Sequence, residues 1–364
     1  MRSLYVLLGA VAIHMVGFGA VIPSIPYVLK ELGGDAQLQG VLVSLYSIMQ
    51  MATAPIWGYV SDRVGRSVVA AAGLALAAVG HLSMYFARDL WIFTLGRVVA
   101  GVGGGTLPAL QAMIADMSPA DRRASSMALF GVAFGVGFVL GPAIGGVLAA
   151  VEVKTPFIAA ALLSLTSALL VGTIPNTKAA VSYRLDLGLG LLALPILFLN
   201  IGFSIFEGLL SYFAAFAASF TPTEVGLLLA LSGAAAAAAQ PIVKRLEGGG
   251  SGRGAAYGLA AAAVGLVLIT SSLWARPLIY IGVVVATVGQ VVASSFIFAT
   301  VSKRAGGLGL GALQSAGAFG RIVGPVLGGF LYTNAGPAAP FATAALITLL
   351  TLPLLFRVVE KVAV

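Results

Sequence analysis

The stretch GYVSDRVGRS at residues 58–67 joins two apolar runs, residues 38–60 and 68–87. Each run is long enough to cross a lipid bilayer, which takes on the order of 20 apolar residues. Glycine and aspartate suit a tight turn, and Arg63 and Arg66 suit the cytoplasmic side of a membrane. The stretch therefore predicts a short cytoplasmic loop between two membrane-spanning helices.

Composition supports the same interpretation along the whole chain of 364 residues. Hydrophobic residues make up 60% and charged residues 9% of the sequence, whereas a soluble domain is about half apolar and a quarter charged. The net charge of +8 is spread singly between apolar runs, which argues against a nucleic-acid-binding face. With no cysteine and only His14 and His81, neither a disulfide framework nor a metal cluster is expected.

Twelve apolar runs are long enough to span a bilayer. They lie at about 4–29, 38–60, 68–87, 90–115, 124–149, 155–174, 187–214, 222–243, 255–274, 277–300, 308–333 and 337–357. Lysine and arginine then fall fourteen on the side of the N-terminus and four on the other, so both termini are expected in the cytoplasm. Arg97 and Arg321 are the two cations placed inside spans.

An internal repeat divides the spans into two halves. GPAIGG at 141–146 recurs as GPVLGG at 324–329, a shift of 183 residues. We expect an N-terminal six-helix bundle at 1–174, a cytoplasmic linker at 175–186 and a C-terminal bundle at 187–364. Parallel repeats of this kind place a substrate between the halves near the midplane of the membrane.

The loop at 58–67 resembles the G-x-x-x-D-R-x-G-R signature of the major facilitator superfamily, although any charged tight turn would share its residue types. The resemblance implies an all-α membrane protein of the major facilitator fold, with twelve helices in two pseudo-symmetric bundles. It also implies a gating cluster that bridges the halves and favours one access state. Its members here are Gly58, Asp62, Arg63, Gly65, Arg66 and, as the acidic partner at the end of span four, Asp116.

Span five is rich in glycine and resembles the antiporter signature of proton-coupled exporters. The residues that carry this similarity are Gly137, Gly141, Pro142, Gly145 and Gly146. Close packing between helices needs the same small residues, and their recurrence in span eleven fits packing as well. Both interpretations stay open at this point.

Span seven carries Glu207, the acidic residue placed within a span, and Asn200 lies seven residues before it. Seven residues are close to two helical turns, so both side chains share one face. The arrangement is similar to the vesicular monoamine transporter branch of the drug:proton antiporters. A carboxylate in a membrane span is costly and marks a functional site by default; alternatively Glu207 pairs with Arg321 or lies near the outer interface.

Further polar groups are expected near the substrate. His14 lies about 15 Å along span one, at 1.5 Å per residue, where amine-transporting relatives have an acid; a packed and a titrating histidine are both open. Gln314 in span eleven also replaces an acid of those relatives, whereas His81 is expected to be structural. Arg97 would influence a proton on Glu207 or His14. The expected cavity wall includes Phe18, Tyr46, Gln50, Phe203, Phe206, Gln290 and Ser294.

These features together predict a secondary active transporter in the cell membrane that exports hydrophobic or amphiphilic cationic compounds against protons by alternating access. We expect a monomer without cofactor or enzymatic activity, whose partners are a small-molecule substrate, protons and the lipid bilayer. The glycines at 248–254 lack the G-x-x-x-x-G-K-[ST] pattern, which disfavours ATP-driven transport. The alternatives are an organic-anion or sugar carrier in which Arg97 and Arg321 face the cavity, and a membrane scaffold or lipid scramblase.

Overall fold

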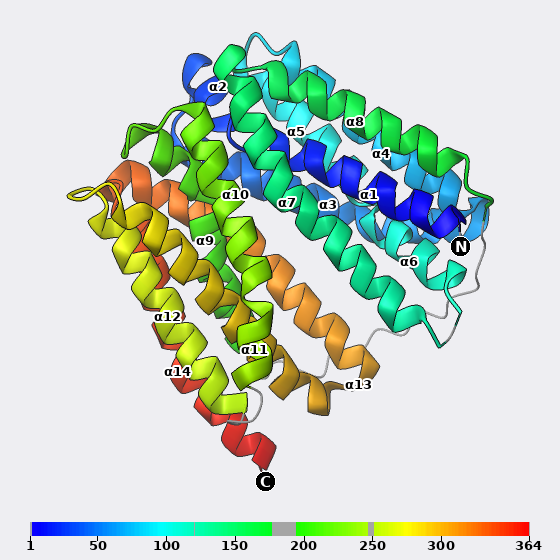
Figure 1. Ribbon diagram of the computed structural model, residues 1–364. Coiled ribbons are helices and arrows are strands. Elements are labelled where there is room, and N and C mark those ends of the chain that lie inside the picture. The colour runs from blue at the N-terminus through cyan, green and yellow to red at the C-terminus, as the bar shows by residue number, and fades with distance from the viewer. Residues whose placement is uncertain (1, 120, 177–193, 247–250, 364) are drawn as a thin grey trace. The chain divides into compact units, whose positions relative to one another are not determined.

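The computed structural model describes residues 2–119, 121–176, 194–246 and 251–363, with side chains described except at 2, 124, 251, 301–314 and 356–363. Within these residues every regular element is a helix (Figure 1). The first eight are α1 (Arg2–Val21), α2 (Ile25–Glu31), α3 (Ala36–Val64), α4 (Arg66–Tyr85), α5 (Leu90–Gly104), α6 (Leu107–Met117), α7 (Arg123–Val151) and α8 (Thr155–Gly172). The others are α9 (Leu194–Phe216), α10 (Pro222–Ala238), α11 (Gln240–Leu246), α12 (Ser251–Ser271), α13 (Leu278–Ala335) and α14 (Ala339–Ala363).

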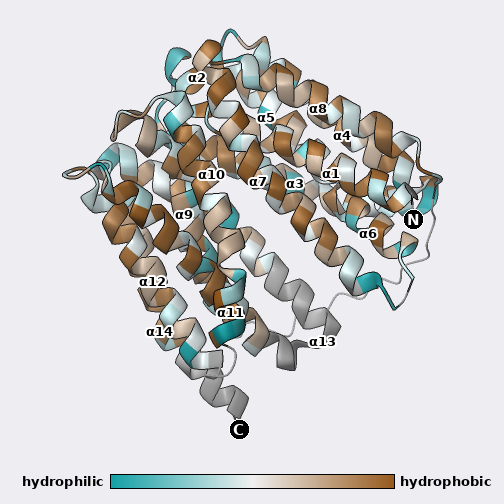
Figure 2. Ribbon diagram, in the orientation of Figure 1, coloured by the Kyte–Doolittle hydropathy of each residue, from teal (hydrophilic) through white to brown (hydrophobic). Residues whose placement is uncertain are grey.

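The helices have the length and composition of membrane spans. Ten described helical segments are long and apolar enough to cross a bilayer, and Ala339–Leu355 is a shorter apolar helix. Large apolar side chains remain exposed along them, including Leu169 at 67% on α8 and Val132 at 61% on α7. Figure 2 shows hydrophobic colour along most of α7 and α8, and hydrophilic colour at the N-terminal end of α7. An apolar surface of this extent is suited to lipid rather than to water.

Local sequence determines where several helices begin. The Asp89 carboxylate accepts a hydrogen bond of 2.8 Å from the Ile92 backbone N–H and so caps α5. Proline occupies the first turn of α2, α6 and α8, where its missing N–H removes no helical hydrogen bond. Gly65 precedes α4 with φ of +118°, a conformation that suits glycine.

Four expected elements differ in detail, one of them the eighth span, which is interrupted at Ala239 between α10 and α11. The expected first span is interrupted between α1 and α2 at residues 22–24, beside Pro23, and the fourth is interrupted between α5 and α6 at 105–106, before Pro108. The loop expected between spans ten and eleven is instead part of the 58-residue helix α13, because the glycine-rich sequence there permits continued helical backbone as well as a turn.

The chain forms two compact units. One unit comprises Met1–Gly34, Leu45–Ser182 and Phe220–Ala230, and the other Asp35–Ser44, Tyr183–Ser219 and Leu231–Val364. The start of α3 thus belongs to the second unit and the start of α10 to the first. The expected domain boundaries stay a prediction, since most of the linker at 175–186 lies outside the described residues.

The sequence repeat corresponds to a repeated contact. In the first unit, a Cβ on Gly226 of α10 would lie 2.4 Å from the Pro142 carbonyl oxygen, and one on Gly146 would lie 2.7 Å from Pro222 O. In the second unit, a Cβ on Gly40 of α3 would lie 2.0 Å from Pro325 O, and one on Gly329 would lie 2.6 Å from Ala36 O. Pro142 and Pro325 occupy equivalent positions of the repeat. In each unit the Gly-Pro segment therefore packs against the first turns of another helix, α10 in the first unit and α3 in the second.

Candidate functional site: polar groups within two helical units

The loop that follows α3 forms a compact ionic cluster in the first unit. The guanidinium of Arg66, a residue with 5% exposure, lies 2.9 Å from an Asp116 oxygen and 3.9 Å from an Asp62 oxygen. Arg63 is exposed instead, with its guanidinium 4.2 Å from the centre of the Tyr59 ring. Gly58 closes the last turns of α3 by accepting a 2.7 Å hydrogen bond from the Ser61 hydroxyl. The structure therefore brings the expected acidic partner Asp116 to Arg66.

Asn176, at the start of the expected linker, forms hydrogen bonds with both ends of this loop. Its side-chain NH₂ donates to Val64 O at 2.9 Å, and its side-chain oxygen accepts from the Ser67 hydroxyl at 3.0 Å. The amide occupies the space beside Gly65, where a Cβ would lie 1.8 Å from the Asn176 nitrogen. Two independent reasons, backbone conformation and contact with Asn176, therefore require glycine at position 65.

A second polar group lies inside the first unit. His14 Nδ1 lies 3.0 Å from the Ser164 hydroxyl of α8, and both residues are buried. The Arg97 guanidinium is 5.0 Å from the centre of the Tyr46 ring, and Arg97 itself has 4% exposure. Gln50 donates from its amide to Gly104 O at 3.3 Å. The structure thus brings His14, Arg97 and Gln50 into one region of the first unit.

His81 belongs to the same region. The imidazole is 1% exposed, its Nδ1 has no hydrogen-bond partner among the described residues, and its charge interacts with those of His14 and Arg97. Because the three residues come from α4, α1 and α5, no spacing within one helix could reveal that they are neighbours.

The second unit holds a cavity of about 170 Å³. Asn200 of α9 and Arg321 of α13 line it, together with Ile196, Leu199, Ser294, Phe298 and Gly317. The NH₂ group of the Asn200 side chain donates a hydrogen bond of 2.8 Å to Ile196 O. The side-chain oxygen is the group of Asn200 that can accept a hydrogen bond. The side chain of Gln314 lies outside the described residues.

Glu207 of α9 is exposed, whereas the residues on either side of it in the sequence, Phe206 and Gly208, are buried. Its charge interacts with that of Arg321, although no ion pair joins the two among the ion pairs of the described residues. α9 packs on α13: Ser204 donates to Gly320 O at 3.0 Å, and a Cβ on Gly324 would lie 2.7 Å from Ile201 O. Ser204 lies three residues before Glu207, so this packing involves the side of α9 that carries Glu207.

Span five, the glycine-rich helix α7, packs tightly on α1. Cβ atoms on Gly137, Gly141 and Gly145 would lie 2.2 Å from Met15 Cβ, 2.7 Å from Val16 O and 2.0 Å from Ala20 O. The packing interpretation of these glycines therefore has direct geometric support, since small residues allow the backbones to approach.

Several residues expected in the wall of the substrate cavity are in contact with one another. The Phe18 and Tyr46 ring centres are 5.3 Å apart, and those of Phe203 and Phe206 are 5.4 Å apart. Gln290 is buried and Ser294 donates to Val291 O at 3.1 Å. Sequence reasoning missed Asn176 and Ser164, because a single polar residue near or within an apolar run carries no local signal for its partner.

Two units of apolar helices, each with buried polar groups and its own Gly-Pro contact, define a polytopic helical membrane protein. The model of the Major Facilitator Superfamily matches residues 7–187 and 192–363. The chain belongs to that superfamily, which confirms the family inferred from the loop at 58–67 and the expectation of a transporter rather than an enzyme.

Tetracycline resistance proteins are among the relatives of the chain. It is 31% identical over 377 residues to the class G tetracycline resistance protein of Vibrio anguillarum, covering 95% of each chain. It is 39% identical over 166 residues to the class C tetracycline resistance protein of Escherichia coli, a match that covers 45% of this chain and 42% of that protein. The human organic anion transporter MFSD10 has the same fold, with a TM-score of 0.71, 24% identity and coverage of 97% of this chain and 99% of that one.

Proposed function

We propose that the protein is a proton-coupled antiporter that exports hydrophobic or amphiphilic cationic organic compounds by alternating access. The observation that carries this proposal is Glu207, a carboxyl group exposed on α9 between the buried residues Phe206 and Gly208. A charged side chain in contact with lipid is strongly unfavourable, so this face is expected to meet water or a polar ligand. The similarity to tetracycline resistance proteins supports export as the direction.

Glu207 would alternate between a proton and the cationic group of the substrate. A bound cation stabilises the carboxylate, and a proton neutralises it when no cation is present. Asn200, Arg321 and Ser294 supply the polar groups of the adjoining cavity wall.

Twelve spans with both termini in the cytoplasm complete the proposal. The ten apolar helical segments, the shorter one at Ala339–Leu355 and the second half of α13 are consistent with this number. In this topology the ionic cluster of Asp62, Arg66 and Asp116 lies on the cytoplasmic side. It would stabilise one access state, and its release would accompany the change to the other.

The test uses purified protein in liposomes with an imposed pH gradient. Glu207→Gln keeps the size of the side chain but holds no transferable proton, so gradient-driven accumulation of a cationic amphiphile should fall at least tenfold. Glu207→Asp should retain part of the activity. Glu152→Gln is the matched control, because Glu152 is exposed beyond the end of α7. Undiminished gradient-driven transport by Glu207→Gln would overturn the proposed role.

The organic-anion alternative is separated in the same liposomes. Competition by cationic compounds, with no effect of neutral analogues of equal size, supports the proposal. Competition by anions alone would favour the alternative, and the absence of accumulation for any compound would favour a scaffold or scramblase.

A further inference from the structure

We propose that the first unit holds a binding site for a carboxylate group of the substrate, formed by Arg97, His81 and His14. This inference rests on the proposed function and narrows its substrate class to amphiphiles that carry an acidic group in addition to the cation. The site differs from Glu207 in location and in charge.

The backbone contact between α4 and α5 determines the position of two members of the site. A Cβ on Gly80 would lie 2.7 Å from Gly96 O, and one on Gly96 would lie 2.8 Å from Gly80 O. His81 and Arg97 directly follow these two glycines, so the crossing brings their backbones together. Glycine at both positions is what permits this approach.

His14 joins the site through the Tyr46 ring. His14 and Tyr46 line a common cavity, and the Arg97 guanidinium lies over the same ring at 5.0 Å. The cavity has a volume of about 10 Å³, which is about the space that one water-sized group occupies. Gln50 and Thr106 also line it, and the Gln50 amide and Tyr46 hydroxyl provide further hydrogen-bonding groups.

Charge balance indicates the kind of ligand. Arg97 is 4% exposed, and its Nε has no hydrogen-bond partner among the described residues. The ion pairs found in the described part of the chain involve Arg66 and Arg122 and leave Arg97 without a carboxylate. The cation–π contact with Tyr46 offsets only part of the free-energy cost of burying a charge that has no ionic partner. A negatively charged ligand would provide the ionic partner that Arg97 lacks among the described residues.

A carboxylate suits this site better than a larger anion. The guanidinium group offers parallel N–H donors that match the two oxygens of a carboxylate. His81 Nδ1, which is buried without a partner, can accept or donate a further hydrogen bond according to its tautomer. The small cavity beside the site, which His14 lines but Arg97 and His81 do not, has room for one oxygen of the carboxylate.

The test compares two ligands that differ only in the acidic group. An amphiphilic aromatic amine that carries a carboxylic acid and its methyl ester have the same body and cation, but only the first is negatively charged. Dissociation constants are measured with the full-length protein in lipid nanodiscs. We expect the wild-type protein to bind the acid at least tenfold more tightly than the ester.

Substitutions assign that preference to the site. Arg97→Gln should bring the two dissociation constants to within about twofold of each other. Arg97→Lys should give an intermediate ratio, because lysine keeps the charge but lacks the paired N–H donors of the guanidinium group. His81→Gln should lower the ratio severalfold. Arg88→Gln is the control at an exposed arginine and should retain the full preference. Ester binding reports that each variant is folded.

Equal binding of acid and ester by the wild-type protein, or a full preference in Arg97→Gln, would overturn the inference. Added acetate should weaken binding of the acid but not of the ester; equally strong competition by chloride would instead assign the site to inorganic anions and contradict the carboxylate assignment. Failure of the proposed function is distinguishable, because it would appear as the absence of gradient-driven export of the ester.

Discussion

Replacing Gly65 by alanine should destabilise the protein by two separable effects. Gly65 has φ of +118° and ψ of 147°, a region that is essentially restricted to glycine, so the backbone change alone costs about 1–3 kcal/mol. The new Cβ would also lie 1.8–2.1 Å from the side-chain atoms of Asn176. Asn176 must then leave, which breaks its hydrogen bonds to Val64 O and Ser67. At about 1 kcal/mol for each bond, the total loss is about 3–5 kcal/mol.

A matched glycine separates the two effects. Gly336 has φ of 93° and ψ of 170°, and a Cβ there would meet no atom within 4 Å. Gly336→Ala should therefore show the backbone cost of about 1–3 kcal/mol alone. Unfolding free energies would be measured in mixed detergent micelles, with thermal denaturation as a second readout.

A double-mutant cycle completes the test. In an Asn176→Ala background the amide is already absent, so Gly65→Ala should cost only as much as Gly336→Ala. Equal effects of Gly65→Ala and Gly336→Ala in the parent protein, or full additivity of Gly65→Ala with Asn176→Ala, would refute the contact as the cause.

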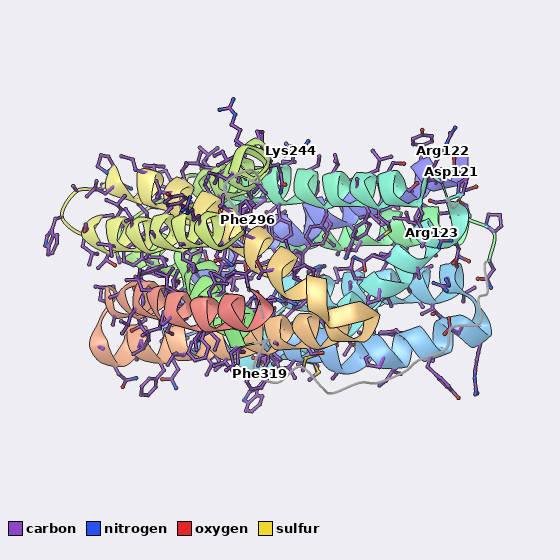
Figure 3. All side chains as sticks on the ribbon, turned by 90° about the horizontal axis from the view of Figure 1, so that it is seen from below. Asp121, Arg122, Arg123, Lys244, Phe296 and Phe319 are labelled. Atoms are coloured by element: carbon purple, nitrogen blue, oxygen red, sulfur yellow. The ribbon has the colours of Figure 1, made fainter. Side chains whose placement is uncertain are left out.

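Two further predictions concern packing and charge. Asp116→Asn should lower the free energy of unfolding by about 1–3 kcal/mol, because it removes the carboxylate that lies 2.9 Å from the buried Arg66. The loss is limited because Asp116 is partly exposed, and a partly exposed ion pair stabilises a protein less than a fully buried one. Asp121→Asn, at an exposed pair that projects outward in Figure 3, should change thermal stability very little; equal shifts would contradict this account. Gly145→Val should cost about 1–3 kcal/mol through overpacking, whereas Gly135→Val, where a Cβ meets nothing within 4 Å, should be tolerated. Equal denaturation temperatures for these two variants would show that close packing on α1 is not required.

Local patterns predicted the overall architecture well. Apolar length corresponds to the ten described helical segments that could span a membrane, and the repeated GPAIGG and GPVLGG segments correspond to matching contacts at Gly226 and Gly40. The loop at 58–67 predicted both the family and the approach of Asp116 to Arg66. The spans and the repeat depend on residues close in sequence or on a fixed spacing, whereas the approach of Asp116 to Arg66 follows from the family resemblance.

Partners across helices could not be predicted in this way. His81 was assigned a structural role on its own, and only the crossing of α4 with α5 brings it near Arg97. Asn176 follows an apolar helix without any pattern that points to Gly65. The continuous helix α13 also differs from expectation, because glycine allows a turn or a helix and tertiary packing decides between them. The site roles assigned to Glu207, Asn200 and Arg321 stay predictions.

The most direct test of the central claim is a measurement of proton movement driven by substrate. Wild-type protein is reconstituted in liposomes that enclose a pH-sensitive dye, with no initial pH gradient, and a cationic amphiphile is added on one side. Proton-coupled antiport predicts proton flow opposite to the substrate, which Glu207→Gln abolishes and Glu152→Gln retains. Substrate movement by the wild-type protein without any change in internal pH would contradict the account.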